Sequence, residues 1–423
     1  MITGMTETKT NLCKEQQNTT TGKGRRCRVC TGCGRCPGVT QKIHILTEGG
    51  MNEKPQPIGE NSRKRLVTVD IGTTTIAMKL YRRDGSVADV FAAVNPQTVY
   101  GADVLSRIQA AENPADADKM KQMVRETLAQ GIRRFRRKLA PGENLRMVLA
   151  ANTTMNYLLM GLNPAELGRA PFHATHLEAV ETEVDGVNCY CFPGLSAFVG
   201  GDITAGIYAA DMLNRDDIFL LIDLGTNGEM VLGNRKKLLA SSVAAGPAFE
   251  GGVNRGVWGA DMISLLAALR KEGILDETGL LAEPYFETGV LAGNVRVTQE
   301  SVRAVQLAKA AVLSGIRILT EEYGISMEQI DRVILSGGFG YYLSPGAAGE
   351  IGLLPQTLVP KTVQGGNTAL SGTLKFGRKL LDGTVSPDTD LFAEAGCNVR
   401  VINLAERQGF AENYLTSMNL CPI

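Results

Sequence analysis

A short motif occurs twice in this sequence, as VDIGTTT at residues 69–75 and as IDLGTNG at residues 222–228. Each copy ends an apolar run with an aspartate, Asp70 or Asp223, and continues with a glycine and with hydroxyl or amide side chains. Backbone N–H groups and hydroxyls in such a turn can hold phosphate oxygens, and a carboxylate at a strand end can hold Mg²⁺ through water. Two ordinary Asp-Gly hairpin turns are the simpler interpretation. The duplication favours two phosphate-binding turns that face each other.

Similar orders of elements surround the two copies. Apolar periodicity predicts strands and then helices around the first copy, and the same order follows the second copy. The segments expected in the first half are strands at 66–70, 74–81, 87–94, 145–151 and 187–193, with helices at 101–112, 116–139, 153–161 and 203–213. Those expected in the second half are strands at 218–223, 228–233, 237–243 and 331–335, with helices at 259–271, 299–323 and 367–381. The sequence therefore predicts two similar α/β lobes with a cleft between them.

Composition and charge exclude several classes of protein. A chain of 423 residues can bury the cores of two or three domains, which excludes a disordered or fibrous protein. Lys+Arg and Asp+Glu both number 44, and the resulting net charge of zero argues against a nucleic-acid-binding protein. The first twenty residues are polar and no stretch approaches about eighteen apolar residues, so we expect neither a signal peptide nor a membrane span. We therefore expect a cytoplasmic protein.

The N-terminal part of the chain has a composition of its own. Residues 1–65 contain twelve Lys and Arg against five Glu, so they carry +7 and the remainder carries −7. Four of the nine cysteines, Cys27, Cys30, Cys33 and Cys36, follow one another at C-x2-C-x2-C-x2-C spacing, before a proline. The ferredoxin pattern of a [4Fe–4S] cluster is one residue longer at its last interval, so Cys13 or another chain is an alternative fourth ligand. The spacing predicts an iron–sulfur cluster, with a zinc site as the main alternative.

Two further stretches contain glycines beyond apolar strands. SGGFG at 336–340 places Gly337 and Gly338 where backbone can lie against a planar ring, and Phe339 is predicted to pack on that ring. SSVAAGPAFEGG at 241–252 includes Gly246, and its small residues can approach a phosphate or a closing domain. A close-packed turn is the alternative for that second stretch.

An acidic residue, Asp202, lies in GGDITAG at 200–206, at a predicted strand-to-helix junction. A phosphoryl-transfer site needs a group that deprotonates or orients the attacking atom, and Asp202 is our candidate for it. The alternative is that Asp202 caps the following helix. Glu229 and Glu250 are weaker candidates for the same role.

Together these motifs resemble the superfamily of acetate and sugar kinases, Hsc70 and actin, over about residues 65–382. Its two phosphate motifs match 70–75 and 223–229, its adenosine motif matches 336–340, and its connecting motifs match 200–206 and 365–372. The resemblance implies a duplicated ribonuclease-H-like α/β fold with an ATP cleft between the lobes. It implies that Asp70 and Asp223 organise Mg²⁺ and act with Asp202 in catalysis. The implied ATP-binding residues are Gly72, Thr73, Thr74, Gly225, Thr226, Asn227, Gly246, Gly337, Gly338 and Phe339.

Within that superfamily the chain looks closest to the reductive activators of corrinoid enzymes, which are iron–sulfur ATPases. The letters that carry this resemblance include NPQTVYGADVLSRI (95–108), AANTTMNYLLMGL (150–162), LLIDLGTNGEMVLGN (220–234) and AAGPAFEGG (244–252). Many members of the family carry a plant-type [2Fe–2S] domain, whereas this chain has about sixty residues there, with a cysteine run suited to [4Fe–4S]. The resemblance implies ATP-dependent transfer of one electron to the Co(II) corrinoid of a methyltransferase corrinoid protein, which regenerates Co(I). An external low-potential electron donor is implied as a second partner, and a homodimer is one option for the assembly.

Three other functions remain as alternatives. A small-molecule kinase would use the same cleft, but phosphoryl transfer has no use for a redox centre. A metal-binding scaffold with a degenerate ATP site would not need both Asp-x-Gly-Thr turns. An ATPase activator of another low-potential metalloenzyme, of the 2-hydroxyacyl-CoA dehydratase type, would hold its cluster with cysteines inside the lobes.

We predict five segments along the chain. They are a cysteine-rich iron–sulfur segment at 1–48, a linker at 49–64, a first actin-like lobe at 65–215, a second actin-like lobe at 216–383, and a C-terminal strand–helix tail at 384–423.

Overall fold

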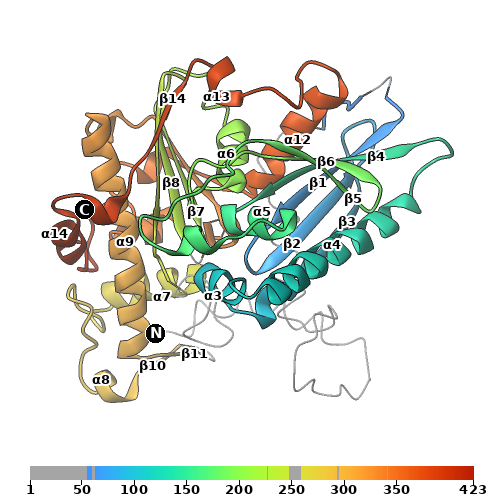
Figure 1. Cartoon of the computed structure of the whole chain (residues 1–423). Helices are drawn as coiled ribbons and strands as arrows, with labels where there is room; N and C mark the ends of the chain where they lie inside the picture. Colours follow the sequence, from blue (N-terminus) through green and yellow to red (C-terminus); the bar gives the residue numbers. More distant parts are fainter. Residues whose placement is uncertain (1–54, 60–61, 226, 247–258, 293–294, 341) are drawn as a thin grey trace.

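The computed structural model describes residues 55–59, 62–225, 227–246, 259–292, 295–340 and 342–423 (Figure 1). The predicted cluster ligands Cys27, Cys30, Cys33 and Cys36 lie outside these residues, as does the predicted phosphate contact Thr226. Within the described ranges, every helix is too short or too polar to span a lipid bilayer.

Two six-stranded sheets form the centre of the molecule (Figure 1). The order in the first sheet is β3 (Val87–Val94), β2 (Thr75–Tyr81), β1 (Lys64–Ile71), β4 (Asn144–Ala151), β6 (Val187–Cys191) and β5 (Val180–Val184). The order in the second sheet is β13 (Thr362–Gly366), β12 (Arg332–Ser336), β7 (Phe219–Leu224), β8 (Gly228–Asn234), β9 (Lys237–Val243) and β14 (Asn398–Val401). A separate hairpin joins β10 (Val290–Ala292) to β11 (Val295–Val297).

The two sheets repeat one topology. β1 runs antiparallel to β2 and parallel to β4, and β7 runs antiparallel to β8 and parallel to β12 in the same way. The β-branched and aliphatic side chains of these central strands are buried on both faces, as expected for strands covered by helices. The duplication predicted from the motifs is therefore confirmed.

Helices cover both sheets. The longer ones are α3 (Val104–Ala110), α4 (Pro114–Arg136), α5 (Thr153–Met160), α6 (Gly201–Ala209), α7 (Gly259–Lys271), α9 (Gln299–Tyr323), α12 (Thr368–Leu381) and α14 (Phe410–Thr416). The shorter ones are α8 (Tyr285–Thr288), α10 (Gly337–Gly340), α11 (Pro345–Glu350) and α13 (Leu391–Glu394), and 3₁₀ turns lie at Pro96–Val99, Ala165–Gly168, Met327–Gln329, Val359–Lys361 and Leu404–Glu406. α4 packs on the outer side of the first sheet and α9 on the outer side of the second (Figure 1).

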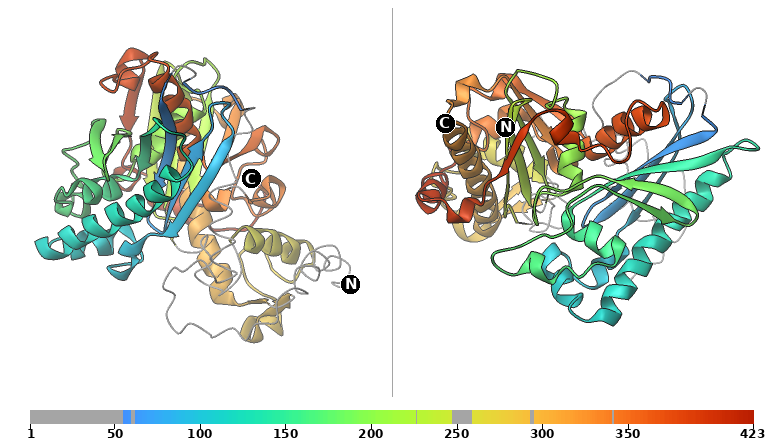
Figure 2. Two further views of the ribbon diagram at one scale, coloured as in Figure 1. Left: turned by 90° about the vertical axis from the view of Figure 1, so that its right-hand side faces the viewer. Right: turned by 45° about the horizontal axis from the view of Figure 1, so that its top comes forward.

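α6 and α12 lie between the two sheets, as Figure 1 and the right-hand view of Figure 2 show. The two helices cross closely because Gly372 of α12 has no side chain at the crossing. A Cβ atom on Gly372 would lie 1.9 Å from the backbone oxygen of Ala205 in α6. Next to this crossing, Tyr190 of β6 stacks on Phe376 of α12 with ring centroids 4.4 Å apart. The two lobes therefore contact each other through backbone atoms of α6 and α12 and through stacked aromatic side chains.

The Gly372→Ala substitution is expected to lower the free energy of unfolding by about 1–3 kcal/mol, the usual cost of overpacking. The added methyl group meets backbone, which cannot rotate away as a side chain can. Gly346 in α11 is the matched control, since a Cβ there would meet nothing closer than 3.9 Å. Gly346→Ala should be neutral or slightly stabilising, because alanine favours helix. Urea titrations of both variants measure the two effects, and equal stabilities would contradict the close crossing.

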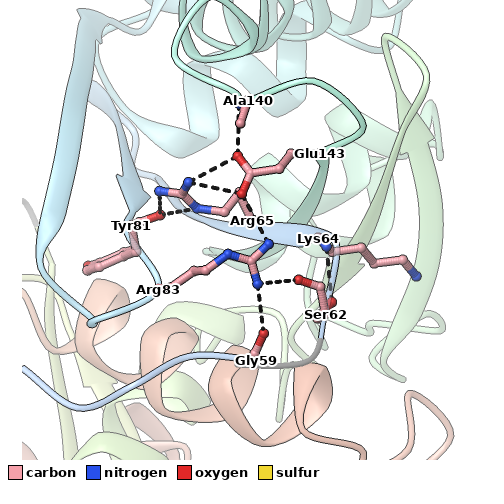
Figure 3. Close-up of polar contacts among 8 residues, drawn as sticks. All are labelled: Gly59, Ser62, Lys64, Arg65, Tyr81, Arg83, Ala140 and Glu143. Atoms are coloured by element: carbon pink, nitrogen blue, oxygen red, sulfur yellow. Dashed lines mark hydrogen bonds and ion pairs between the residues drawn. The ribbon is translucent and has the colours of Figure 1, made fainter.

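The chain enters the first lobe through an ordered segment around Ile58, which is buried. The N–H of Ile58 donates to the backbone oxygen of Arg83 (2.8 Å), and the Arg83 guanidinium donates to the oxygens of Ser62 (2.6 Å) and Gly59 (3.4 Å) (Figure 3). Glu143 bridges Arg83 and Arg65, each at 3.1 Å (Figure 3).

The far end of α12 holds the same segment. Arg378 donates to the side-chain oxygen of Gln56 (3.0 Å), and Asp382, the C-cap of α12, accepts from the N–H of Gly59 (2.9 Å). Residues 55–59 are therefore fixed to both α12 and the first sheet.

The C-terminal residues join the second lobe. β14 adds to the second sheet parallel to β9, and α14 packs against α9. The buried ammonium of Lys309 in α9 donates to the backbone oxygens of Ser417 (2.7 Å) and Asn419 (2.5 Å). These bonds fix the chain end against α9.

Candidate functional site

Four carboxylates lie close enough to repel one another where the lobes meet. Asp70 lies at the end of β1, Asp202 in the first turn of α6, Asp223 on β7 and Glu229 on β8. Burial, with smaller contributions from the neighbouring carboxylates, raises the pKa of Asp70 and of Asp202 to about 7. Burial likewise raises the pKa of Asp223 and, strongly, that of Glu229. Such a cluster favours a cation or a shared proton.

Side chains from the second lobe hold two of these carboxylates. The amide of Asn367 donates to Asp70 Oδ2 (2.7 Å), and its oxygen caps α12 by accepting from the N–H of Leu370 (2.7 Å). The buried hydroxyl of Ser336 donates to Asp223 Oδ2 (2.7 Å) and lies 2.6 Å from the Thr368 hydroxyl. The start of α12 therefore connects the equivalent acids of both lobes.

The first Asp-x-Gly-Thr turn, residues 72–75, which is predicted to bind phosphate, is held from behind by three side chains. Asn95 Nδ2 donates to the oxygen of Gly72 (2.9 Å), and Arg107 Nη2 donates to the oxygen of Thr73 (2.6 Å). Asn152 Nδ2 donates to the Thr73 hydroxyl (3.1 Å). The turn therefore has a fixed conformation.

The second turn has three residues between the paired Leu224 and Gly228, one fewer than the four between the paired Ile71 and Ile76 in the first turn. Asp70 pairs with Ala77 across the first hairpin, whereas Asp223 pairs with Glu229 across the second. Side chains of directly paired residues lie on one face of a sheet, so two acids are neighbours here, and their repulsion contributes to the raised pKa of Glu229. Asn227 donates a side-chain hydrogen bond to Glu229 and lowers its pKa by a lesser amount. The shorter turn thus adds a fourth acid that has no counterpart in the first lobe.

The SGGFG residues lie beside Asp223. Gly337 has φ +83°, and a Cβ there would lie 2.5 Å from Asp223 Oδ1, so only glycine lets the carboxylate approach. Phe339 belongs to the hydrophobic core of the second lobe and is 6% exposed. Gly246 has φ +73°, and a Cβ there would meet no atom of the described residues within 4 Å; Gly338 is half-buried. Contact of Phe339 with an adenine ring stays a prediction.

Asp202 is not the N-cap of α6. Gly200 occupies the cap position, and Asp202 lies in the first turn, where its Oδ1 accepts from the adjacent N–H of Ile203 (2.9 Å). An acid near a helix N-terminus is stabilised by the helix dipole. Here burial outweighs that effect, because the pKa of Asp202 is raised and not lowered.

Asp202 should make the stability of the ligand-free protein depend on pH. A carboxyl whose pKa rises on folding contributes its full stability below its unfolded pKa, 3.8, and loses it as the pH rises to about 7. Asp202→Asn, which stays uncharged, should therefore match the wild type near pH 4 and be more stable above pH 7, by about 4 kcal/mol. Urea titrations at several pH values, with EDTA and without nucleotide, measure this difference. A difference that does not change with pH would contradict the raised pKa.

Sequence reasoning missed several residues of the site. Asn367 and Thr368 lie in GGNTALSG, the connecting motif at 365–372, and Asn95 and Arg107 lie in the stretch 95–108, but the sequence assigns them no role. Each acts on a residue distant in the sequence, so spacing alone carries no signal for it. Within the part of the chain that the structure describes, no group of three or more His, Cys, Asp or Glu side chains is arranged to hold a metal by itself.

Several known proteins are similar to this chain in sequence and in fold. A sequence model of the RACo middle region matches residues 66–215, and one of the C-terminal domain of RACo, the ASKHA domain, matches residues 217–255 and 253–422. The corrinoid activation enzyme RamQ of Eubacterium limosum is 31% identical, over 75% of this chain and 65% of that protein. A Co(II) methylated amine-specific corrinoid protein reductase of Methanosarcina barkeri is 24% identical, over 42% of each chain. The solved structure of a reductive activator for corrinoid, iron–sulfur protein has a TM-score of 0.72 and 28% identity, and the match covers 85% of this chain and 66% of that one.

The duplicated sheets, with acids at the ends of equivalent strands, define a protein of the ASKHA class, which contains actin, Hsc70 and the sugar kinases. Within that class, the chain belongs to the RACo family, the reductive activators of corrinoid proteins. It spans about two thirds of the length of RamQ and of the solved reductive activator.

Proposed function

We propose that this protein is an ATP-dependent reductive activase for the corrinoid protein of a methyltransferase system. It takes one electron from an external low-potential donor and delivers it to Co(II), which becomes Co(I). ATP and water are converted to ADP and phosphate in the same cycle. The family relatives support the corrinoid substrate, since RamQ is named for corrinoid activation and the Methanosarcina barkeri protein for corrinoid protein reduction.

The acid cluster and the two turns support the nucleotide part of this proposal. Mg²⁺ in nucleotide sites is usually held by one or two carboxylates together with phosphate oxygens, and Asp70 and Asp223 fit that role. The N–H groups and hydroxyls of Thr73, Thr74, Thr226 and Asn227 would hold the phosphates, with Gly72 and Gly225 shaping the turns. Asp202, whose pKa lies near neutrality, would accept a proton from the attacking water. Gly246, Gly337, Gly338 and Phe339 would lie near the rest of the nucleotide.

The observation that carries the proposal is the contact between Asn367 and Asp70. It joins the N-cap of α12, which follows the second sheet, to the strand-end acid of the first sheet. A cation that binds Asp70 competes with the Asn367 amide for this carboxylate and so alters a contact between the lobes. Binding of nucleotide can then shift the population of lobe arrangements, which is what couples ATP to a partner.

The electron part of the proposal rests on the N-terminal cysteines. Cys27, Cys30, Cys33 and Cys36 would hold an iron–sulfur cluster, of the [4Fe–4S] type by spacing, which supplies one-electron redox chemistry. Each ~59 mV of uphill one-electron transfer costs about 1.4 kcal/mol, so coupling to ATP makes a low-potential reduction feasible. The net charge of +7 on residues 1–65 suits docking to acidic proteins.

We propose that the protein acts in the cytoplasm and that its function is divided among five segments of the chain. Residues 1–48 form the redox segment, 49–64 the linker, 65–215 and 216–383 the two lobes, and 384–423 the C-terminal tail. The chain acts alone or as a homodimer.

One experiment tests the function. Protein purified without oxygen is mixed with ATP, a low-potential reductant and a Co(II) corrinoid protein from the same organism, and the Co(I) absorbance is followed. We expect Co(I) only when protein, ATP and reductant are all present. Reduction without ATP, or none with any corrinoid protein of that organism, would overturn the proposal and favour a small-molecule kinase. ATP consumption with phosphate transferred to an added alcohol or carboxylate would then identify that kinase.

A further inference from the structure

The back of the first phosphate turn is fully occupied by hydrogen-bond donors. Three consecutive backbone oxygens, those of Gly72, Thr73 and Thr74, accept from Asn95 Nδ2, Arg107 Nη2 and the N–H of Asn95 at 2.6–2.9 Å. Both donor residues come from the stretch 95–108, which the function has so far left without a role. Both are also fully buried.

This arrangement fixes the direction of the N–H groups of the turn. In a trans peptide the C=O of one residue and the N–H of the next point in opposite directions. When the oxygens of Gly72 and Thr73 point back to Asn95 and Arg107, the N–H groups of Thr73 and Thr74 point forward. Among the described residues, no group accepts from these two N–H groups at hydrogen-bond distance. Consecutive N–H groups that point the same way form an anion-binding concavity.

The guanidinium of Arg107 lies directly behind the turn and is a buried positive charge. Arg107 is 0% exposed and, in the described part of the chain, no carboxylate lies within ion-pair distance of it. Its other donors go to the oxygen of Gly101 (3.0 Å) and to the sulfur of Met155 (3.5 Å), which is a weak acceptor. Burial lowers the pKa of Arg107 to about 10, so it stays charged at neutral pH. Burying an unpaired cation is costly unless an anion or several dipoles compensate it.

We propose that Arg107 is a positioning residue for the phosphates of a bound nucleoside polyphosphate, acting through the Thr73 peptide. The bond from Arg107 orients the Thr73 peptide so that its oxygen points away from the phosphate and the Thr74 N–H points toward it. The positive charge of Arg107, on the other side of this peptide group, also attracts the phosphate. Asn152 completes the arrangement by orienting the Thr73 hydroxyl. The inference rests on the proposed function, because it takes residues 72–75 to be the phosphate turn.

The test compares ligands with and without phosphates. ATP, ADP and adenosine are titrated calorimetrically into the full-length wild type and into the Arg107→Met, Arg107→Lys and Asn152→Ser variants. We expect Arg107→Met to lower the affinity for ATP and for ADP by about tenfold or more, because one charge-assisted hydrogen bond is lost. The affinity for adenosine should stay unchanged. Arg107→Lys should be intermediate, because it keeps the charge and loses the planar geometry. Arg133→Met, an exposed position on α4 paired with Glu126, is the matched control and should change none of the affinities.

A second variant keeps the test decisive if Arg107→Met does not fold. Asn152 caps α5 by accepting from the N–H of Met155, and serine caps equally well, so Asn152→Ser should fold and lose only the bond to Thr73. The Asn152→Ser substitution should lower the affinity for ATP more than the affinity for adenosine. Equal weakening of ATP and adenosine, or unchanged ATP affinity in the folded variants, would overturn the positioning role. A wild type that binds no ATP would overturn the proposed function as well.

Discussion

Asp202→Asn is expected to reduce ATP turnover by about 10²–10⁴-fold, the usual contribution of a general base, and to leave ATP binding nearly unchanged. The carboxylate lies in a half-buried cluster with Asp70 and Asp223, and its pKa of about 7 suits proton transfer at neutral pH. Asparagine has the same size and can still accept from the Ile203 N–H, but it cannot take up a proton. Phosphate release under saturating ATP measures turnover, and calorimetry measures binding.

The wild type should also gain activity as the pH rises through about 7, since a base must be deprotonated. Asp216→Asn is the matched control, because Asp216 is exposed and pairs with Arg235 away from the cluster. Unchanged turnover in Asp202→Asn would remove Asp202 from the chemistry. Lost ATP binding would instead give it a role in holding the nucleotide or its cation.

Cys30→Ser is expected to abolish corrinoid reduction while ATP hydrolysis continues. Loss of an outer-shell partner already costs a metal site ~10–100-fold, and loss of a ligand should cost more. The residues proposed to bind ATP all lie beyond residue 65, so the nucleotide site should survive. The measurements are iron and sulfide content, the Co(I) absorbance and phosphate release in the same preparation.

Cys397→Ser is the control for this experiment. Cys397 is half-buried in the second lobe, and its thiol donates to the backbone oxygen of Asn234 (3.7 Å), a bond that serine can replace. The Cys397→Ser variant should keep the iron–sulfur cluster and the ability to reduce the corrinoid. A full iron content in all four variants Cys27→Ser, Cys30→Ser, Cys33→Ser and Cys36→Ser would place the cluster elsewhere, and zinc in place of iron would favour the alternative metal.

Much of the fold could be predicted because the strong signals are local. The strands 87–94 and 237–243 and the helices 259–271 and 299–323 have the bounds that apolar periodicity predicts. β5 and β13 were not predicted, because they are short and carry exposed polar residues, such as the glutamates of β5. For such strands the pairing partner, and not the sequence of the strand, determines the structure.

The site could be predicted less completely than the fold. Asp70 and Asp223 lie at strand ends as their motifs indicate, because a strand followed by a glycine turn is a local pattern. Glu229 faces Asp223 only because the second hairpin is one residue shorter, which shifts its register. The bond from Asn367 to Asp70 joins residues 297 positions apart, and no periodicity indicates it. Phe339 is buried in the core of the second lobe, and its contact with the nucleotide stays a prediction.

α12 has the geometry of a lever. Its 14 residues make a rod about 21 Å long, held at one end by Asn367 on Asp70 and at the other by Arg378 and Asp382 on residues 55–59. For a rigid rod of that length, each degree of tilt about the first end displaces the second by about 0.4 Å. Because both contacts belong to one helix, a rearrangement at Asp70 that tilts α12 would also displace the chain at Gln56.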